Sequence, residues 1–139
     1  MSADEPSTAE RTIKVFLVDD QRMIGEVIRR MLLDQADISF HFCDDPTEAL
    51  ARANELRPDV ILQDLVMPQI SGLELVAKYR SNPATASTPI IVLSATGAAT
   101  TRAQAEAAGA NDFIVKVPPR AALVACIRSH AAKAQTSAQ

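Results

Sequence analysis

Five short segments of the chain have the hydrophobic pattern of β-strands. They are TIKVFLV (12–18), ISFHFC (38–43), DVILQ (59–63), PIIVLSA (89–95) and DFIV (112–115). The first, third and fourth are apolar almost throughout, which is typical of parallel strands buried on both faces. In the second, Ile38, Phe40 and Phe42 alternate with smaller or polar residues, so this strand is expected at the edge of a sheet.

Segments with helical spacing lie between these strands. Residues 21–34 place apolar side chains on one helix face and charged side chains on the other. Capping boxes are predicted from Asp45 with Glu48, where Pro46 takes the first helical position, and from Ser71 with Glu74.

The last two helices are predicted from weaker signals. An Ala-rich segment over 98–108 is helix-prone and ends at Gly109, and Pro119 begins a final helix. Strands that alternate with helices five times predict an α/β fold, a (βα)5 doubly wound parallel sheet. The strand order expected is 2-1-3-4-5, with a ligand site at the carboxyl ends of strands 1 and 3.

Polar side chains stand at the points where four of the five strands end. They are Asp19 and Asp20 after the first strand, Asp64 after the third, Ser94 at the end of the fourth and Lys116 after the fifth. Because the carboxyl ends of parallel strands meet at one edge, these side chains are expected to converge on one pocket. Three neighbouring carboxylates repel each other and favour a hard cation such as Mg²⁺. The ammonium and hydroxyl groups suit a phosphoryl group.

Four motifs in order along the chain resemble those of a known family. FLVDDQ, LQDLVMPQISGLEL, IIVLSATG and AGANDFIVK are similar to the receiver (CheY-like) domain of two-component response regulators. The resemblance covers about residues 12–130 and implies a flavodoxin-like fold. The motifs also resemble, more weakly, those of the receivers that precede diguanylate cyclase domains.

The resemblance implies a role for each pocket residue. Asp64 would be the phosphoacceptor, and Asp20 and Asp64 would bind Mg²⁺ together with the backbone carbonyl of Val66. Asp19 would be a direct or an indirect ligand of the same ion.

The same resemblance implies a switch. Ser94 would hydrogen-bond the aspartyl phosphate and Lys116 would pair with a phosphoryl oxygen. Phe113 matches the aromatic residue whose inward or outward rotamer reports phosphorylation. The output surface would be the helix at 98–108, the strand at 112–115 and the helix that begins at Pro119.

The implied partners are a histidine kinase or a histidine phosphotransfer protein. A homodimer through the last two helices and a C-terminal output domain are compatible with the resemblance. The domain would not be an enzyme in the ordinary sense, although Mg²⁺-dependent autophosphorylation and autodephosphorylation would be intrinsic to it.

The chain departs from the family pattern at two places. Most receivers have Pro directly after the Lys, often with a cis bond, whereas here Val117 and then Pro118 follow Lys116. A cis bond at Val117–Pro118 is therefore not assumed. Val66 is apolar and cannot hydrogen-bond an attacking water, so solvent access is expected to set the phosphoryl lifetime.

The composition of the chain limits the number of domains, the kinds of partner and the location that are expected. The chain has 139 residues and no Trp, which predicts one domain with an aliphatic core. Its net charge of −3 gives no indication of a basic surface that would bind nucleic acid. Residues 1–11 are expected to be a disordered leader, 12–132 the receiver domain and 133–139 a flexible tail or the start of a linker. No signal peptide or membrane span is evident, which favours the cytoplasm.

Two pairs of chemically reactive residues have plainer interpretations. Cys43 and Cys126 follow no metal-ligand spacing and are interpreted as buried thiols rather than as a disulfide or a reactive pair. His41 and His130 are interpreted as an edge-strand residue and a late-helix residue without a catalytic role.

Three alternative functions place other requirements on the sequence. A haloacid dehalogenase-type phosphatase would need a second acid two residues after its nucleophile, where this chain has Val66. Dinucleotide binding would need a Gly-rich fingerprint that is missing here. A receiver-like interaction module that works without phosphorylation stays open, because of the departure after Lys116.

Overall fold

The computed structural model describes residues 12–138 as alternating strands and helices. The elements are β1 (Ile13–Val18), α2 (Arg22–Leu32), β2 (Ile38–Cys43), the short 3₁₀ helix η1 (Pro46–Glu48), α3 (Ala49–Leu56), β3 (Val60–Asp64), α4 (Gly72–Ser81), β4 (Ile90–Ser94), α5 (Ala99–Ala108), β5 (Asp112–Val115) and α6 (Arg120–Ala138). All five predicted strands are confirmed. The leader predicted over 1–11 lies outside the described residues.

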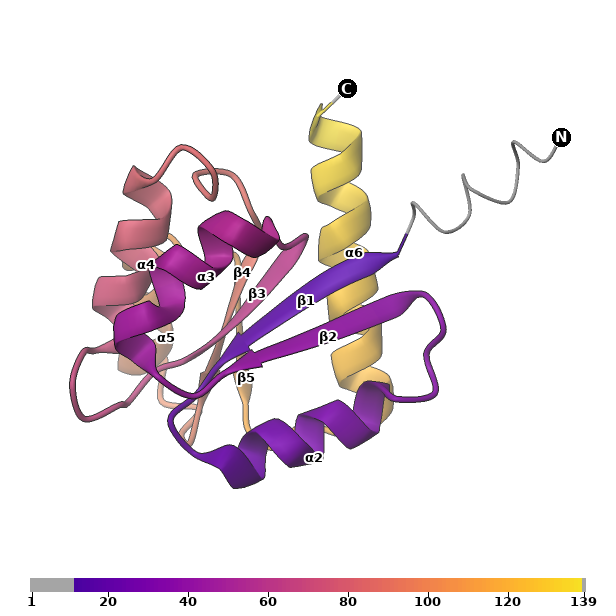
Figure 1. Cartoon of the computed structure of the whole chain (residues 1–139). Coiled ribbons are helices and arrows are strands. Elements are labelled where there is room, and N and C mark those ends of the chain that lie inside the picture. Colours follow the sequence, from indigo (N-terminus) through magenta and orange to yellow (C-terminus); the bar gives the residue numbers. More distant parts are fainter. Residues whose placement is uncertain (1–11, 139) are drawn as a thin grey trace, which may run out of the picture.

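The five strands form one parallel sheet in the order β2-β1-β3-β4-β5, as predicted. The alternating strand β2 is at an edge, and the apolar strands β1, β3 and β4 are in the middle (Figure 1). The expected order follows from burial, because only central strands of such a sheet are covered on both faces.

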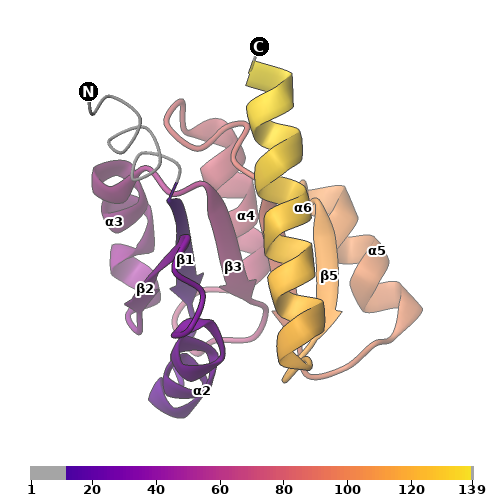
Figure 2. The same cartoon turned by 90° about the vertical axis from the view of Figure 1, so that its right-hand side faces the viewer.

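Helices cover both faces of the sheet and produce two apolar cores. In β1, Val15 and Leu17 pack with α2 and α6, whereas Phe16 and Val18 pack on the face that carries α3, α4 and α5. This alternation follows from the two-residue period of a strand. The arrowheads in Figure 2 point to one end of the molecule, and α6 runs past the opposite end of the sheet.

Helix ends follow the predicted caps with one correction. Ser71 and Glu74 form the predicted capping box, and Gly109 ends α5 with φ 118°. Asp45 does cap the next segment, but it accepts hydrogen bonds from the amide and hydroxyl of Thr47 rather than forming a box with Glu48. The chain first makes a 3₁₀ turn there, and α3 begins only at Ala49.

The final helix α6 continues through Ala138, beyond the expected domain boundary at residue 132. The segment assigned to a tail or linker is therefore helical as far as the structure describes it. Its role as a linker stays a prediction.

Helix α4 begins very close to the end of β3, and Gly72 makes this approach sterically feasible. The amide of Gly72 donates to the carbonyl of Leu65 at 2.8 Å. A Cβ atom on Gly72 would collide with the backbone oxygen of Asp64 and would lie 2.7 Å from the Cα of Leu65. Both obstacles are backbone atoms, which cannot rotate away.

We expect Gly72→Ala to lower the free energy of unfolding by about 1–3 kcal/mol, because overpacking against the backbone forces a shift of the loop. Denaturant unfolding followed by circular dichroism measures this. Gly97→Ala is the matched control, since its Cβ would meet only the Val115 side chain, at 3.2 Å. Equal stability of the Gly72→Ala variant and the parent would show that the loop can move freely.

Candidate functional site

Extensions of the β-ladder place the candidate site residues. The amide of Asp19 donates to the carbonyl of Cys43 on β2 at 3.2 Å, and the amide of Lys116 donates to the carbonyl of Ser94 on β4 at 2.8 Å. Asp64 is itself the last residue of β3. The predicted residues therefore meet at one edge of the sheet because their strands are in register.

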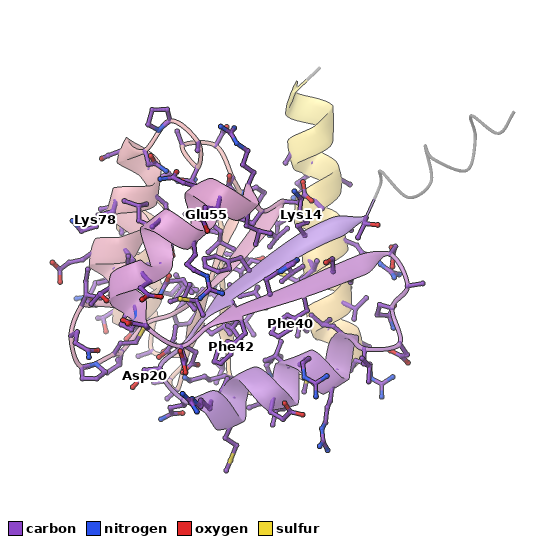
Figure 3. The ribbon with its side chains drawn as sticks, in the orientation of Figure 1. Lys14, Asp20, Phe40, Phe42, Glu55 and Lys78 are labelled. Carbon is purple, nitrogen blue, oxygen red and sulfur yellow. The ribbon has the colours of Figure 1, made fainter. Side chains whose placement is uncertain are left out.

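The three carboxylates form one cluster with a single cation beside them. Oxygens of Asp19, Asp20 and Asp64 all lie within 4.8 Å of one another. The Nζ of Lys116 lies 2.7 Å from Oδ1 of Asp64 and 3.1 Å from Oδ2 of Asp19. Asp19 and Asp64 are buried, while Asp20 is partly exposed at the end of β1 (Figure 3).

The electrostatics of this cluster are unbalanced. Burial raises the pKa of Asp64, the charges of Asp19 and Asp20 add to the rise, and the hydrogen bond from Lys116 only partly opposes it. Burial alone would lower the pKa of Lys116, but its hydrogen bond to Asp64 and the charge of Asp19 outweigh this and raise it. Three acids with one ammonium leave an excess of negative charge.

This donor set suits a hard divalent cation. Carboxylate oxygens are the ligands that Mg²⁺ and Ca²⁺ use, and Mg²⁺ is usually bound by one or two carboxylates with retained waters. The partial exposure of Asp20 leaves one side of the cluster open to solvent. The residues present therefore fit such an ion.

Ser94 and Phe113 lie near this cluster on β4 and β5. Ser94 is buried, and its Oγ accepts a hydrogen bond from the amide of Thr96 at 3.1 Å. The hydroxyl thus caps the local turn in this conformation. The ring of Phe113 is buried on the α5 side of the sheet, with the guanidinium of Arg102 5.0 Å from its centroid.

The loops that follow Asp64 and Lys116 differ from one another. Val66, two residues after Asp64, is 79% exposed and therefore packs against little of the protein. The one cis peptide bond in the described part of the chain joins Lys116 to Val117. The Val117–Pro118 bond, which the sequence left open, is therefore trans.

Two contacts around the site have no signal in the sequence. The hydroxyl of Tyr79 on α4 donates to Oε1 of Gln63 at 2.9 Å, and the Nε2 of Gln63 donates to the backbone oxygen of Asp64, also at 2.9 Å. This buried chain of hydrogen bonds fixes the backbone at Asp64. The second contact is that of the Arg102 guanidinium with the Phe113 ring. Both contacts join residues that are far apart in the sequence or on different elements, so they depend on tertiary packing.

Among the remaining reactive residues, Cys43 lies beside this cluster, since its backbone carbonyl accepts a hydrogen bond from the Asp19 amide, whereas Cys126 and His130 lie on α6. His41 is on β2 and His130 on α6, as predicted. Both cysteines are free; Cys43 is buried as predicted, but Cys126 is only partly buried.

We expect Asp64→Asn to be more stable than the parent at pH 7 in EDTA, by roughly 1 kcal/mol, because it removes one of three clustered charges. The pKa of Asp64 is raised in the folded state, so ionisation of this carboxyl lowers the free energy of unfolding at pH values above the folded-state pKa. This loss of stability disappears as the pH falls towards the pKa of an unfolded-state aspartate, which is about 4. Urea unfolding measured from pH 7 to pH 4 should show that the difference in free energy of unfolding between Asp64→Asn and the parent decreases.

The matched control is Asp34→Asn, which removes a carboxylate from an exposed ion pair with Arg120. It should change stability by less than about 1 kcal/mol. A destabilised Asp64→Asn variant at pH 7 would mean that its ion pair with Lys116 dominates the cluster.

Comparison with known proteins identifies the family. A model of the response regulator receiver domain matches residues 15–128. Transcriptional regulatory protein ResD of Bacillus subtilis is 37% identical over 103 residues, 74% of this chain and 41% of ResD. The chain spans about half the length of the curated relatives it matches.

Solved structures agree with this match. Chemotaxis protein CheY4 of Vibrio cholerae superposes with a TM-score of 0.79 at 30% identity, covering 85% of this chain and 98% of CheY4. A Burkholderia pseudomallei response regulator with a phosphorylated aspartic acid, calcium ion and citrate has a TM-score of 0.75 at 22% identity, covering 90% of this chain and 72% of that one. The latter likeness shows the fold alone. The chain belongs to the family of response regulator receiver domains, the phosphoryl-accepting signalling modules of two-component systems.

Proposed function

We propose that Asp64 is the phosphoacceptor of this receiver domain. The observation that carries the proposal is the position of its carboxylate, which is buried at the carboxyl end of β3, 2.7 Å from the Nζ of Lys116 and beside Asp19 and Asp20. Among the three acids of the cluster, Asp64 alone comes from the central strand β3. The phosphorylated aspartic acid and calcium ion of the Burkholderia relative support this chemistry on the same fold.

In the proposed reaction an oxygen of Asp64 attacks the phosphorus of a phosphohistidine on a partner protein. The P–O bond to Asp64 forms as the P–N bond to the histidine breaks, and water later hydrolyses the aspartyl phosphate to inorganic phosphate. Lys116 offsets the charge that develops on the phosphoryl oxygens, so catalysis is by positioning and electrostatics.

Asp19, Asp20, Asp64 and the backbone carbonyl of Val66 are proposed to hold Mg²⁺. The ion would supply further positive charge next to the transferred group. The same residues, with Lys116, would support autophosphorylation from small phosphodonors and autodephosphorylation.

We further propose that Ser94 and Phe113 transmit the signal. The Oγ of Ser94 would leave the Thr96 amide and donate to a phosphoryl oxygen, which would move the loop after β4. The Phe113 ring would then change its packing, and the surface of α5, β5 and α6 would change with it.

The partners follow from the family and stay proposals. They are a histidine kinase or phosphotransfer protein, a C-terminal output domain and a second copy through α5 and α6, in the cytoplasm. Among the described residues, no helix has both the length and the hydrophobicity to cross a bilayer. The phosphorylation-independent module remains the second candidate, because Val117 replaces the usual Pro after Lys116.

The first experiment is an intact mass after incubation with Mg²⁺ and acetyl phosphate. We expect the parent to gain one phosphoryl group and Asp64→Asn to gain none. Asp34→Asn, a carboxylate outside the cluster, should behave as the parent does. A folded parent that gains no phosphoryl group would favour the phosphorylation-independent module.

The exposed side chain of Val66 generates a second prediction. An amide at this position could hydrogen-bond the attacking water, and one hydrogen bond of about 1 kcal/mol corresponds to roughly a fivefold change in the dephosphorylation rate of Val66→Asn. Loss of the phosphorylated mass with time measures both rates. Identical rates would show that this side chain does not set the phosphoryl lifetime, and Met23→Asn, an exposed position on α2, controls for surface polarity changes.

A further inference from the structure

A second cluster of ligating side chains lies at the start of β5, whereas Lys116 follows the end of that strand. Asp112 is the first residue of β5, and Cys126 and His130 are four residues apart on α6, so they share one helix face. A carboxylate oxygen of Asp112, the Sγ of Cys126 and a ring nitrogen of His130 all lie within 4.8 Å of one another.

The individual distances are short. Oδ2 of Asp112 lies 2.9 Å from Nε2 of His130 and 3.4 Å from Sγ of Cys126. Oδ1 of Asp112 accepts a hydrogen bond from the amide of Phe113 at 2.8 Å. The second oxygen is thereby turned towards α6, in the way that outer contacts orient metal-binding carboxylates.

The cluster is accessible from solvent. The side chains of His130 and Asp112 are 13% and 37% exposed. His130 also lines a cavity of about 620 Å³ together with Asp59, Asn111 and Lys133. The cavity therefore reaches the cluster at His130, and the flexible Lys133 side chain can direct its charge into solvent.

We propose that Asp112, Cys126 and His130 form a zinc site with water in the fourth position. Thiolate, imidazole and carboxylate groups are the ligands that Zn²⁺ uses, whereas Mg²⁺ and Ca²⁺ bind through oxygen. Zinc–ligand bonds of about 2.0–2.3 Å separate tetrahedral ligand atoms by roughly 3.3–3.7 Å, so the cluster needs only small shifts. On binding, the Cys126 S–H bond gives way to an S–Zn bond and the proton passes to solvent.

A zinc ion here would join the start of β5 to α6. Without the ion, the same three side chains form a hydrogen-bond network across that interface. Because the metal would bind the folded chain, it should also raise the melting temperature. The proposal does not depend on phosphorylation of Asp64.

Titration of the reduced, EDTA-treated and desalted chain with Co²⁺, followed by Zn²⁺, tests the site. Excess Mg²⁺ is kept present to compete at the Asp19–Asp20–Asp64 cluster. We expect a thiolate-to-cobalt charge-transfer band that saturates at one equivalent and is abolished by Zn²⁺. Absence of this band in the folded parent would overturn the proposal without any variant.

Variants then assign the ligands. Cys126→Ser and His130→Gln should each weaken Zn²⁺ binding, measured against a chromogenic chelator, by about tenfold or more. The chain contains just one other cysteine and one other histidine, so Cys43→Ser and His41→Gln are matched controls that should bind as the parent does. Circular dichroism checks that every variant folds.

Asp64→Asn should also retain Zn²⁺ binding, because Asp64 belongs to the other cluster. Unchanged affinity in both Cys126→Ser and His130→Gln, or loss of binding in Asp64→Asn, would overturn the assignment. The second result would place the zinc in the acidic cluster instead.

Discussion

The ion pairs of Lys116 with Asp64 and Asp19 are the interactions on which the site depends. One ammonium lies 2.7 Å and 3.1 Å from two buried carboxylates, and a third carboxylate is next to them. Removal of the lysine would leave buried charges without a partner, which is far more costly than the pair itself is stabilising. The remaining excess of negative charge is what makes the cluster receptive to a cation.

The surrounding fold holds this unfavourable arrangement in place. Backbone ladder bonds continue past the strand ends and fix Asp19 and Lys116, while Gln63 and Tyr79 fix the backbone at Asp64. Gly72 lets α4 begin against the same loop. The site is therefore held by hydrogen bonds on the side of the sheet, while Asp20 and the exposed Val66 face solvent.

Strand β5 connects the two ends of the sheet. Its four residues begin with Asp112, which contacts α6, and are followed by Lys116, which contacts the acidic cluster. Phe113 lies between these points under Arg102 of α5. This short strand is thus held by side-chain contacts at both of its ends.

The sequence by itself determined the five strands, their order, the Ser71–Glu74 cap and the meeting of Asp19, Asp20, Asp64 and Lys116, because strand periodicity and parallel topology place strand ends at one edge. Tertiary structure alone decided the 3₁₀ turn after Asp45, the contact of Arg102 with Phe113 and the grouping of Asp112 with Cys126 and His130. Cysteine spacing could not indicate the proposed zinc site, since its three candidate ligands come from a strand and a helix that meet only through packing. Local patterns report periodicity, whereas contacts between side chains of different elements depend on how those elements pack.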